Sequence, residues 1–358
     1  MLRRLARGSG RAAGIALAVL LSACGGEKVQ SFGGPTMGST FRVQYVAGAG
    51  TPGKERIQAD VQGILDDLDR EVSTYRDDSD VARFNAAPAG TCRPMPDSVL
   101  ALYDYARILN RDSEGAFDIT LLPALSAWGF GPRGRVAARP SAEALDALRG
   151  VVGMGHIRAE AASDGGARVL CKDAAATVEF NSIAAGYAVD RISGYLQSRG
   201  VTGFLVEVTG ELLARGRKPD GSAWRIALEA PITRARVAER IVALDGLGVS
   251  TSGNYRDYYE EGGVRYSHTF DPRTLSPVTH KLASVSVIAD TALHADGLST
   301  LLMVLGPEKG YEFAVRRGLA ALFVTKSDAG VDETDERAFI VQSTPEFDKR
   351  FPALKGTP

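Results

Sequence analysis

The sequence predicts an α+β protein with mixed, largely antiparallel sheets and flanking helices. The composition is that of a folded globular domain, with 44% hydrophobic and 24% charged residues. Segments with helical spacing of apolar residues are interspersed with segments of alternating residues, without the regular strand–helix–strand order of a parallel sheet. This pattern favours antiparallel sheets, and the length of the chain fits either one large domain or two intimate lobes.

The first half of the chain contains one expected strand and three expected helices. Residues 41–45 (FRVQY) alternate and predict a strand. Apolar residues recur every three or four positions over 57–72 and again over 99–109, which predicts two amphipathic helices. A short helix is expected over 142–148, with Ser141 at its N-cap.

The second half alternates more often between the two kinds of element. Residues 187–198 and 311–317 have helical spacing, and residues 291–305 predict a helix that directly follows the strand expected over 283–288. Further strands are expected over 167–170, 177–180, 203–208, 224–229 and 320–325.

The N-terminus has the pattern of an export signal. Four arginines precede an apolar run of about ten residues over 12–21, which is too short to span a bilayer. The run ends in Leu21-Ser22-Ala23-Cys24, which resembles a lipobox. That resemblance implies cleavage before Cys24, acylation of its sulfur and a lipid-anchored, periplasm-facing protein. The alternative is an ordinary secretory signal with an incidental cysteine.

The chain is therefore expected to comprise a signal peptide (1–23), a lipidated tether (24–31), one catalytic domain (32–351) and a frayed tail (352–358). A net charge of −1 gives no indication of nucleic-acid binding. Cys92 and Cys171 either form a disulfide or remain free thiols, and the sequence leaves both open.

One candidate metal site lies in the segment Asp290–Thr300. Asp296 and Thr300 are four residues apart on a predicted helix and therefore lie on one face. A carboxylate and a hydroxyl on an apolar helix face suit a hard cation such as Mg²⁺. The alternatives are a capping Asp and a Thr that bonds back to its own helix.

Three other segments carry possible chemistry. His268 lies among hydroxyl residues before an Asp-Pro turn, where it is either a working loop histidine or a structural one. Small residues follow the expected strand that ends at Phe180, which suits either phosphate binding or close packing. Phe117 and Trp128 could flank a flat ring, and Asp118 could accept a hydrogen bond from it, but core packing explains the aromatic residues as well.

Together these segments resemble one family, the FAD:protein FMN transferases of the ApbE type. The resemblance covers about residues 32–351. It is carried, in order, by the segments Met37–Thr40, Ser73–Arg76, Val81–Asn85, Gly115–Thr120, Trp128–Phe130, Ile183–Asp190, Thr251–Tyr255, Tyr266–Thr274 and Asp296–Thr300.

The resemblance implies that FAD lies in a cleft between two lobes. Its implied FAD-binding residues are Met37, Tyr75, Ala116, Phe117, Asp118, Glu179, Ala185 and Phe270. The implied Mg²⁺ positions are Ser182, through its carbonyl, Asp296 and Thr300, and His268 is the candidate catalytic base. The chain departs from the family where Glu179 replaces an Asp, Ala185 a Lys or Glu, and Thr209 a Gly.

The implied reaction is Mg²⁺-dependent transfer of the FMN half of FAD to a threonine or serine hydroxyl of a partner protein, with release of AMP. The implied acceptor is a subunit of a membrane redox complex, such as a Na⁺-translocating or Rnf-type system. Two alternatives stay open: a periplasmic FAD pyrophosphatase and a non-catalytic flavin-binding lipoprotein.

Overall fold

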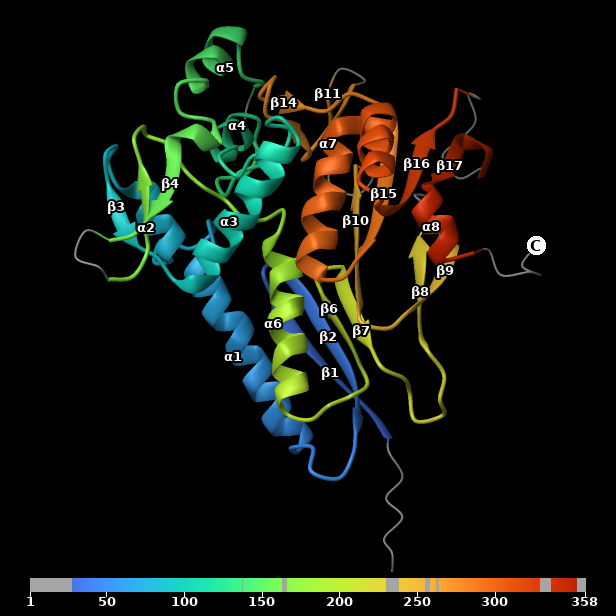
Figure 1. The fold of residues 1–358 in the computed structure, drawn as a ribbon. Helices are drawn as coiled ribbons and strands as arrows, with labels where there is room; N and C mark the ends of the chain where they lie inside the picture. Colours follow the sequence, from blue (N-terminus) through green and yellow to red (C-terminus); the bar gives the residue numbers. More distant parts are fainter. Residues whose placement is uncertain are drawn as a thin grey trace, which may run out of the picture.

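An eight-stranded antiparallel sheet runs through the centre of the molecule (Figure 1). The computed structural model describes residues 28–136, 138–162, 166–229, 238–254, 258–261, 264–328 and 336–352. The expected signal peptide, Cys24 and the tail beyond residue 352 lie outside the described residues. In spatial order the strands are β1 (Lys28–Thr36), β2 (Ser39–Ala47), β6 (Phe204–Val208), β7 (Glu211–Arg215), β10 (Leu247–Gly253), β15 (Leu282–Ala289), β16 (Ala320–Lys326) and β17 (Phe339–Ser343).

A strand that was not expected, β1, precedes the one expected over 41–45, which is part of β2. β1 starts at Lys28, which pairs with Ala47 of β2, so residues 28–31 of the expected tether belong to the sheet. Two glycines and a proline within β1 interrupt the alternation, and its exposed residues give it little hydrophobic signal. Backbone pairing with the more regular β2 decides the conformation of this edge strand.

Three long helices cover one face of the central sheet: α1 (Lys54–Val72), α6 (Ala184–Ser198) and α7 (Ala292–Arg316) (Figure 1). In α1 the residues at helical spacing, among them Ile57, Val61 and Leu65, are fully buried in the main core. The side chains that the sheet points toward this face, such as Val206 and Val287, belong to the same core.

The opposite face of the sheet is covered by a hairpin and a short C-terminal helix. The hairpin comprises β8 (Trp224–Glu229) and β9 (Ala238–Leu244), and the helix is α8 (Pro345–Arg350). Trp224 and Phe347 are buried here with alternate residues of the same strands, such as Leu322. The sheet is therefore buried on both sides.

A second lobe adjoins the helical face and contains α2 (Asp80–Ala86), α3 (Asp97–Asp112), α4 (Leu122–Ala127) and α5 (Ala142–Leu148) (Figure 1). It also holds a small antiparallel sheet in the order β3 (Cys92–Pro94), β5 (Val169–Lys172) and β4 (Ile157–Glu160). Two short strand pairs complete the fold: β11 (Tyr258–Glu261) with β12 (Val264–Ser267), and β13 (Phe270–Asp271) with β14 (Ser276–Pro277). The predicted α+β class is confirmed.

The disulfide that the sequence left open is formed. Cys92 of β3 lies directly opposite Cys171 of β5, and the two sulfurs are bonded. Glu160 also approaches Cys171, but thiols already consumed in a disulfide offer no thiolate ligand for a metal. The bond joins two segments that are 79 residues apart in sequence and fixes the small sheet of the second lobe.

The expected helices over 291–305 and 311–317 are two halves of one kinked helix, α7. Gly306 adopts a φ of 81°, and Pro307 follows it. His280 closes the break, because its Nε2 lies 2.9 Å from the carbonyl oxygen of Met303. The expected strand over 177–180 does not form; Asn85 instead bonds both backbone groups of Val178 through its side chain. Among the described residues no helix is long and apolar enough to cross a bilayer.

Candidate active site

A large cleft of about 1820 Å³ lies between the second lobe and the end of the central sheet that carries the β1–β2 and β6–β7 turns. Small-molecule pockets usually enclose about 300–1,000 Å³, so this cleft has room for a dinucleotide and part of a second molecule. The residues that the resemblance assigned to FAD, Mg²⁺ and the catalytic base all line it: Met37, Tyr75, Ala116, Phe117, Asp118, Glu179, Ser182, Ala185, His268, Phe270, Asp296 and Thr300. The fold thus brings these twelve residues together from both lobes.

The Asp296–Thr300 face of α7 forms part of the cleft wall. Asp296 is only 5% exposed, and its Oδ2 accepts a 2.9 Å hydrogen bond from the backbone N–H of Gly186 on α6. A side chain at Gly186 would lie 2.5 Å from the carbonyl oxygen of Ala292, so only glycine permits this approach. Asp190 of α6 strengthens the contact by accepting hydrogen bonds from the first backbone N–H groups of α7.

A second carboxylate, Glu211, lies close to Asp296 and was not among the site residues proposed from the sequence. It accepts hydrogen bonds from Thr209, at 2.8 Å, and from Ser250, at 3.5 Å. Burial raises the pKa of Asp296 well above its ordinary value, and the negative charge of Glu211 adds to this. Burial likewise raises the pKa of Glu211. Two buried carboxylates that raise each other's cost of ionisation make a site that favours a bound positive charge.

Hydroxyl groups surround this carboxylate pair. Ser299 lies 3.0 Å from Ser250 and 2.9 Å from Ser252, and Ser252 lies 3.5 Å from Thr300. The signal for this network in the sequence is the run Val249-Ser250-Thr251-Ser252, which places polar residues in the interior strand β10. Carboxylate and hydroxyl oxygens are the ligands of hard cations, so the donor set fits Mg²⁺.

A third buried acid, Glu179, faces the cleft from the extended segment before α6. Its Oε2 accepts a 2.9 Å hydrogen bond from the backbone N–H of Asn181. Burial raises the pKa of Glu179 to about 7, and the nearby charge of Asp118 contributes to this. Asp118 itself accepts hydrogen bonds from both the N–H and the hydroxyl of Thr120, so it also orders the turn after Phe117.

Two strained hairpin turns contribute to the cleft from the sheet. Met37 has a φ of 47° in the two-residue turn between β1 and β2, and Thr209 has a φ of 55° in the turn between β6 and β7. Positive φ is unfavourable for both side chains, above all for the β-branched threonine. At Thr209 this conformation places the hydroxyl within hydrogen-bonding distance of Glu211.

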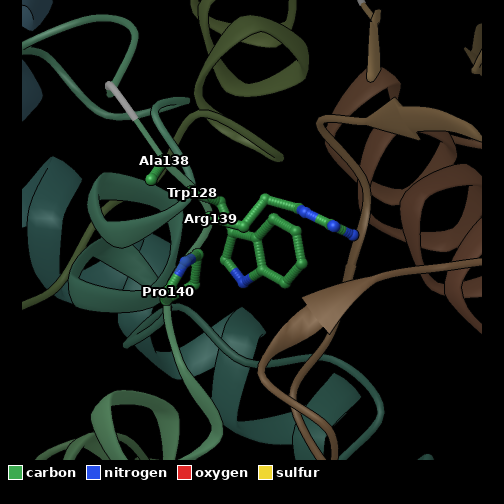
Figure 2. Close-up of a pocket in the computed structure, with 4 residues that line it drawn as sticks. All are labelled: Trp128, Ala138, Arg139 and Pro140. Atoms are coloured by element: carbon green, nitrogen blue, oxygen red, sulfur yellow. The ribbon is translucent and has the colours of Figure 1, made fainter. Parts of the chain in front are cut away.

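Aromatic side chains form the wall of the cleft next to His268. Phe270 packs edge-on against Trp128 and Phe130, with ring centroids 6.3 Å and 5.7 Å away. Trp128 itself does not line the main cleft; it is buried beside it and borders a smaller pocket, where Arg139 extends past its ring (Figure 2) and donates a hydrogen bond to Tyr266. His268 is exposed and lines the main cleft, two residues after Tyr266.

The comparisons with known proteins agree on one class. Residues 37–323 match the ApbE family. The chain is 36% identical over 329 residues to the FAD:protein FMN transferase of Vibrio cholerae, covering 91% of this chain and 97% of that protein. It is 37% identical to the enzyme of the same name from Klebsiella pneumoniae, with 89% and 93% of the two chains covered. The crystal structure of Pseudomonas stutzeri flavinyl transferase ApbE superimposes with a TM-score of 0.83 at 52% identity, covering 92% of this chain and 98% of that one.

The fold and the cleft therefore define a transferase, and the predicted enzyme class is confirmed. The chain belongs to the ApbE family, which confirms the resemblance seen in the sequence.

Proposed function

We propose that this protein transfers the FMN moiety of FAD to a threonine or serine hydroxyl of a partner protein in a Mg²⁺-dependent reaction that releases AMP. The observation that carries the proposal is the buried pair Asp296 and Glu211, which lies with Thr300 in a cleft large enough for FAD. The relatives named FAD:protein FMN transferase support the same donor and the same kind of acceptor.

Asp296 and Thr300 would hold the cation, with the carbonyl of Ser182 as a third ligand by resemblance and Glu211 close by. All four residues line the cleft. When bound, Mg²⁺ would supply positive charge against the diphosphate of FAD and the departing AMP. The hydrogen bond from Gly186 to Asp296 leaves the second carboxylate oxygen for this purpose.

The chain needs no nucleophile of its own, because the attacking hydroxyl belongs to the acceptor. The acceptor oxygen attacks the phosphorus of the FMN half, a phosphoester bond forms, and the bond to the AMP phosphate breaks. The protein must hold that phosphorus in line with the hydroxyl and exclude water. In this scheme His268 accepts the hydroxyl proton in the cleft, because an imidazole suits proton transfer near neutral pH.

A lipid anchor would keep the cleft near membrane-bound acceptors. We propose that Cys24 is acylated and that the protein faces the periplasm. Only four Cα–Cα steps lead from Cys24 to Lys28, the first residue of β1. At about 3.5 Å per residue they span at most about 14 Å, so the domain would lie close to the bilayer. This arrangement suits an acceptor in a membrane redox complex of the Na⁺-translocating or Rnf type.

Incubation of the protein with FAD and Mg²⁺, with and without a candidate acceptor, tests the proposal. Transfer gives covalent flavin fluorescence on the acceptor and one AMP for each flavin attached. Release of FMN and AMP at the same rate without acceptor would show a pyrophosphatase instead. Intact FAD in both mixtures would show a protein that only binds flavin.

A further inference from the structure

The cleft has an uneven distribution of charge. Seven of the side chains that line it are carboxylates, from Asp66 on α1 to Asp296 on α7. Among the described residues that line the cleft, Arg135 is the only lysine or arginine. An arginine stays cationic at all physiological pH values and can donate two parallel hydrogen bonds to a phosphate.

This distribution matters for the donor substrate, and the reasoning here rests on the proposed function. The diphosphate of FAD carries two negative charges at neutral pH, and an acidic cleft repels it. A cation at Asp296 and Thr300 would offset part of this repulsion. A second positive group that bonds the phosphate oxygens directly would offset more, and Arg135 is the side chain of that kind in the cleft wall.

The loop that carries Arg135 is exposed to solvent, but two glycines fold its backbone back on itself. Gly129 has a φ of 83°, and a side chain there would lie 2.9 Å from the backbone nitrogen of Val136 and 3.0 Å from the Cα of Arg135. A side chain at Gly131 would lie 2.3 Å from the hydroxyl of Ser126. These two glycines therefore let the loop fold back on the end of α4 and fix the backbone at Arg135.

The same loop joins the aromatic wall of the cleft. Gly129 and Phe130 line the cleft together with Arg135. The backbone N–H of Phe130 bonds the carbonyl of Leu125 at 2.8 Å, and its ring packs on Phe270, a position that resembles a flavin contact. The Arg135 backbone is thus packed against the segment that forms the proposed flavin wall.

From these observations we infer that Arg135 binds the diphosphate of FAD and is a determinant of affinity for phosphorylated flavins. Its guanidinium would stabilise the negative charge of the donor on the side of the cleft that Gly129 and Phe130 form. The contact is expected in the enzyme–FAD complex whether FAD is later transferred, hydrolysed or only bound.

Titration of FAD into metal-free protein with EDTA and no acceptor, followed by flavin fluorescence, tests this inference apart from the proposed reaction. Arg135→Ala should raise the Kd for FAD by about tenfold to a hundredfold, the value of a hydrogen bond to a charged group. Because one ionic contact is lost, the Kd of this variant should also rise less steeply with salt than that of the wild type. Arg135→Lys keeps the charge and should retain most of the affinity and the salt dependence.

Arg133→Ala is the matched control, because Arg133 lies in the same loop but does not line the cleft. It should leave both the Kd and its salt dependence unchanged. The inference is overturned if Arg135→Ala binds FAD as the wild type does, or binds it more weakly with an unchanged salt dependence. An equal loss in Arg133→Ala would also overturn it, since the effect would then come from net charge alone.

Discussion

The substitution Glu179→Gln should make the ligand-free protein more stable, and only at neutral to alkaline pH. Burial raises the pKa of Glu179 from an ordinary 4.5 to about 7 in the folded protein. Glutamine keeps the size of the side chain and an oxygen for the N–H of Asn181, but it does not ionise. The substitution therefore removes the cost of a buried charge and leaves the contacts in place.

The magnitude follows from the difference between the folded and unfolded pKa values. Below pH 4.5 Glu179 is protonated in both states, so its ionisation does not oppose folding. As pH rises from 4.5 toward 7, the unfolded chain loses the proton while the folded protein retains it, and stability falls. Above pH 7 the full loss is present, about 3 kcal/mol at about 1.4 kcal/mol per pKa unit.

Urea unfolding at about pH 5 and about pH 8.5, with EDTA and without FAD, measures the effect. Glu179→Gln should exceed the wild type by about 3 kcal/mol at the higher pH and by less than about 1 kcal/mol at the lower. Glu308→Gln on the exposed side of α7 is the control and should match the wild type at both pH values. A gain in Glu179→Gln that is equal at both pH values would refute the reasoning, because it would not arise from ionisation.

Three further predictions concern other parts of the chain. His268→Ala should lower kcat about a hundredfold or more and change FAD affinity less than about tenfold. His268→Gln, which cannot take the proton near neutral pH, should be nearly as slow as His268→Ala. If stopped-flow transfer rates of His268→Gln lie within about threefold of the wild type, His268 is not the catalytic base. Cys24→Ser should move the protein from the membrane to the soluble fraction or leave it unprocessed, and a processed variant that stays in the membrane fraction would contradict the lipid anchor. Replacing both Cys92 and Cys171 by Ala should lower the free energy of unfolding by about 4 kcal/mol, given the 79-residue separation, and a loss below about 1 kcal/mol in urea titrations would contradict this.

The longest helices were predictable because each buries one face, so apolar residues recur every three or four positions along the sequence. In α1 the residues at three- and four-residue spacing are those that the core buries, and β15 and β16 are apolar enough to stand out. β1 was missed because two glycines and a proline interrupt it, and β10 because it is rich in glycine, serine and threonine; pairing with neighbouring strands decides the conformation of both. The kink in α7 was foreseen only as a break between two helices, since the role of His280 depends on a contact distant in sequence.

The parts of the site that lie within one short segment were predictable from the sequence. The parts that depend on contacts between distant segments were not. Asp296 and Thr300 are one helical turn apart, so their common face follows from the sequence. Glu211 lies in β7 and Asp296 in α7, far along the chain, so their proximity depends on the tertiary fold. No local sequence pattern predicts it. The same holds for Arg135, which enters the cleft through a loop folded by two glycines.

The most direct test of the central proposal is FMN transfer by wild-type protein and by Asp296→Ala across a range of Mg²⁺ concentrations. Asp296 is the buried carboxylate among the candidate cation ligands, and its removal should cost most of the Mg²⁺ affinity. With a flavin-accepting protein and FAD, the wild type should attach fluorescent flavin and release AMP in equal amounts, only when Mg²⁺ is present. Asp296→Ala should be inactive at limiting Mg²⁺. Covalent flavin formed by Asp296→Ala at the wild-type rate, or by the wild type in EDTA, would contradict the account.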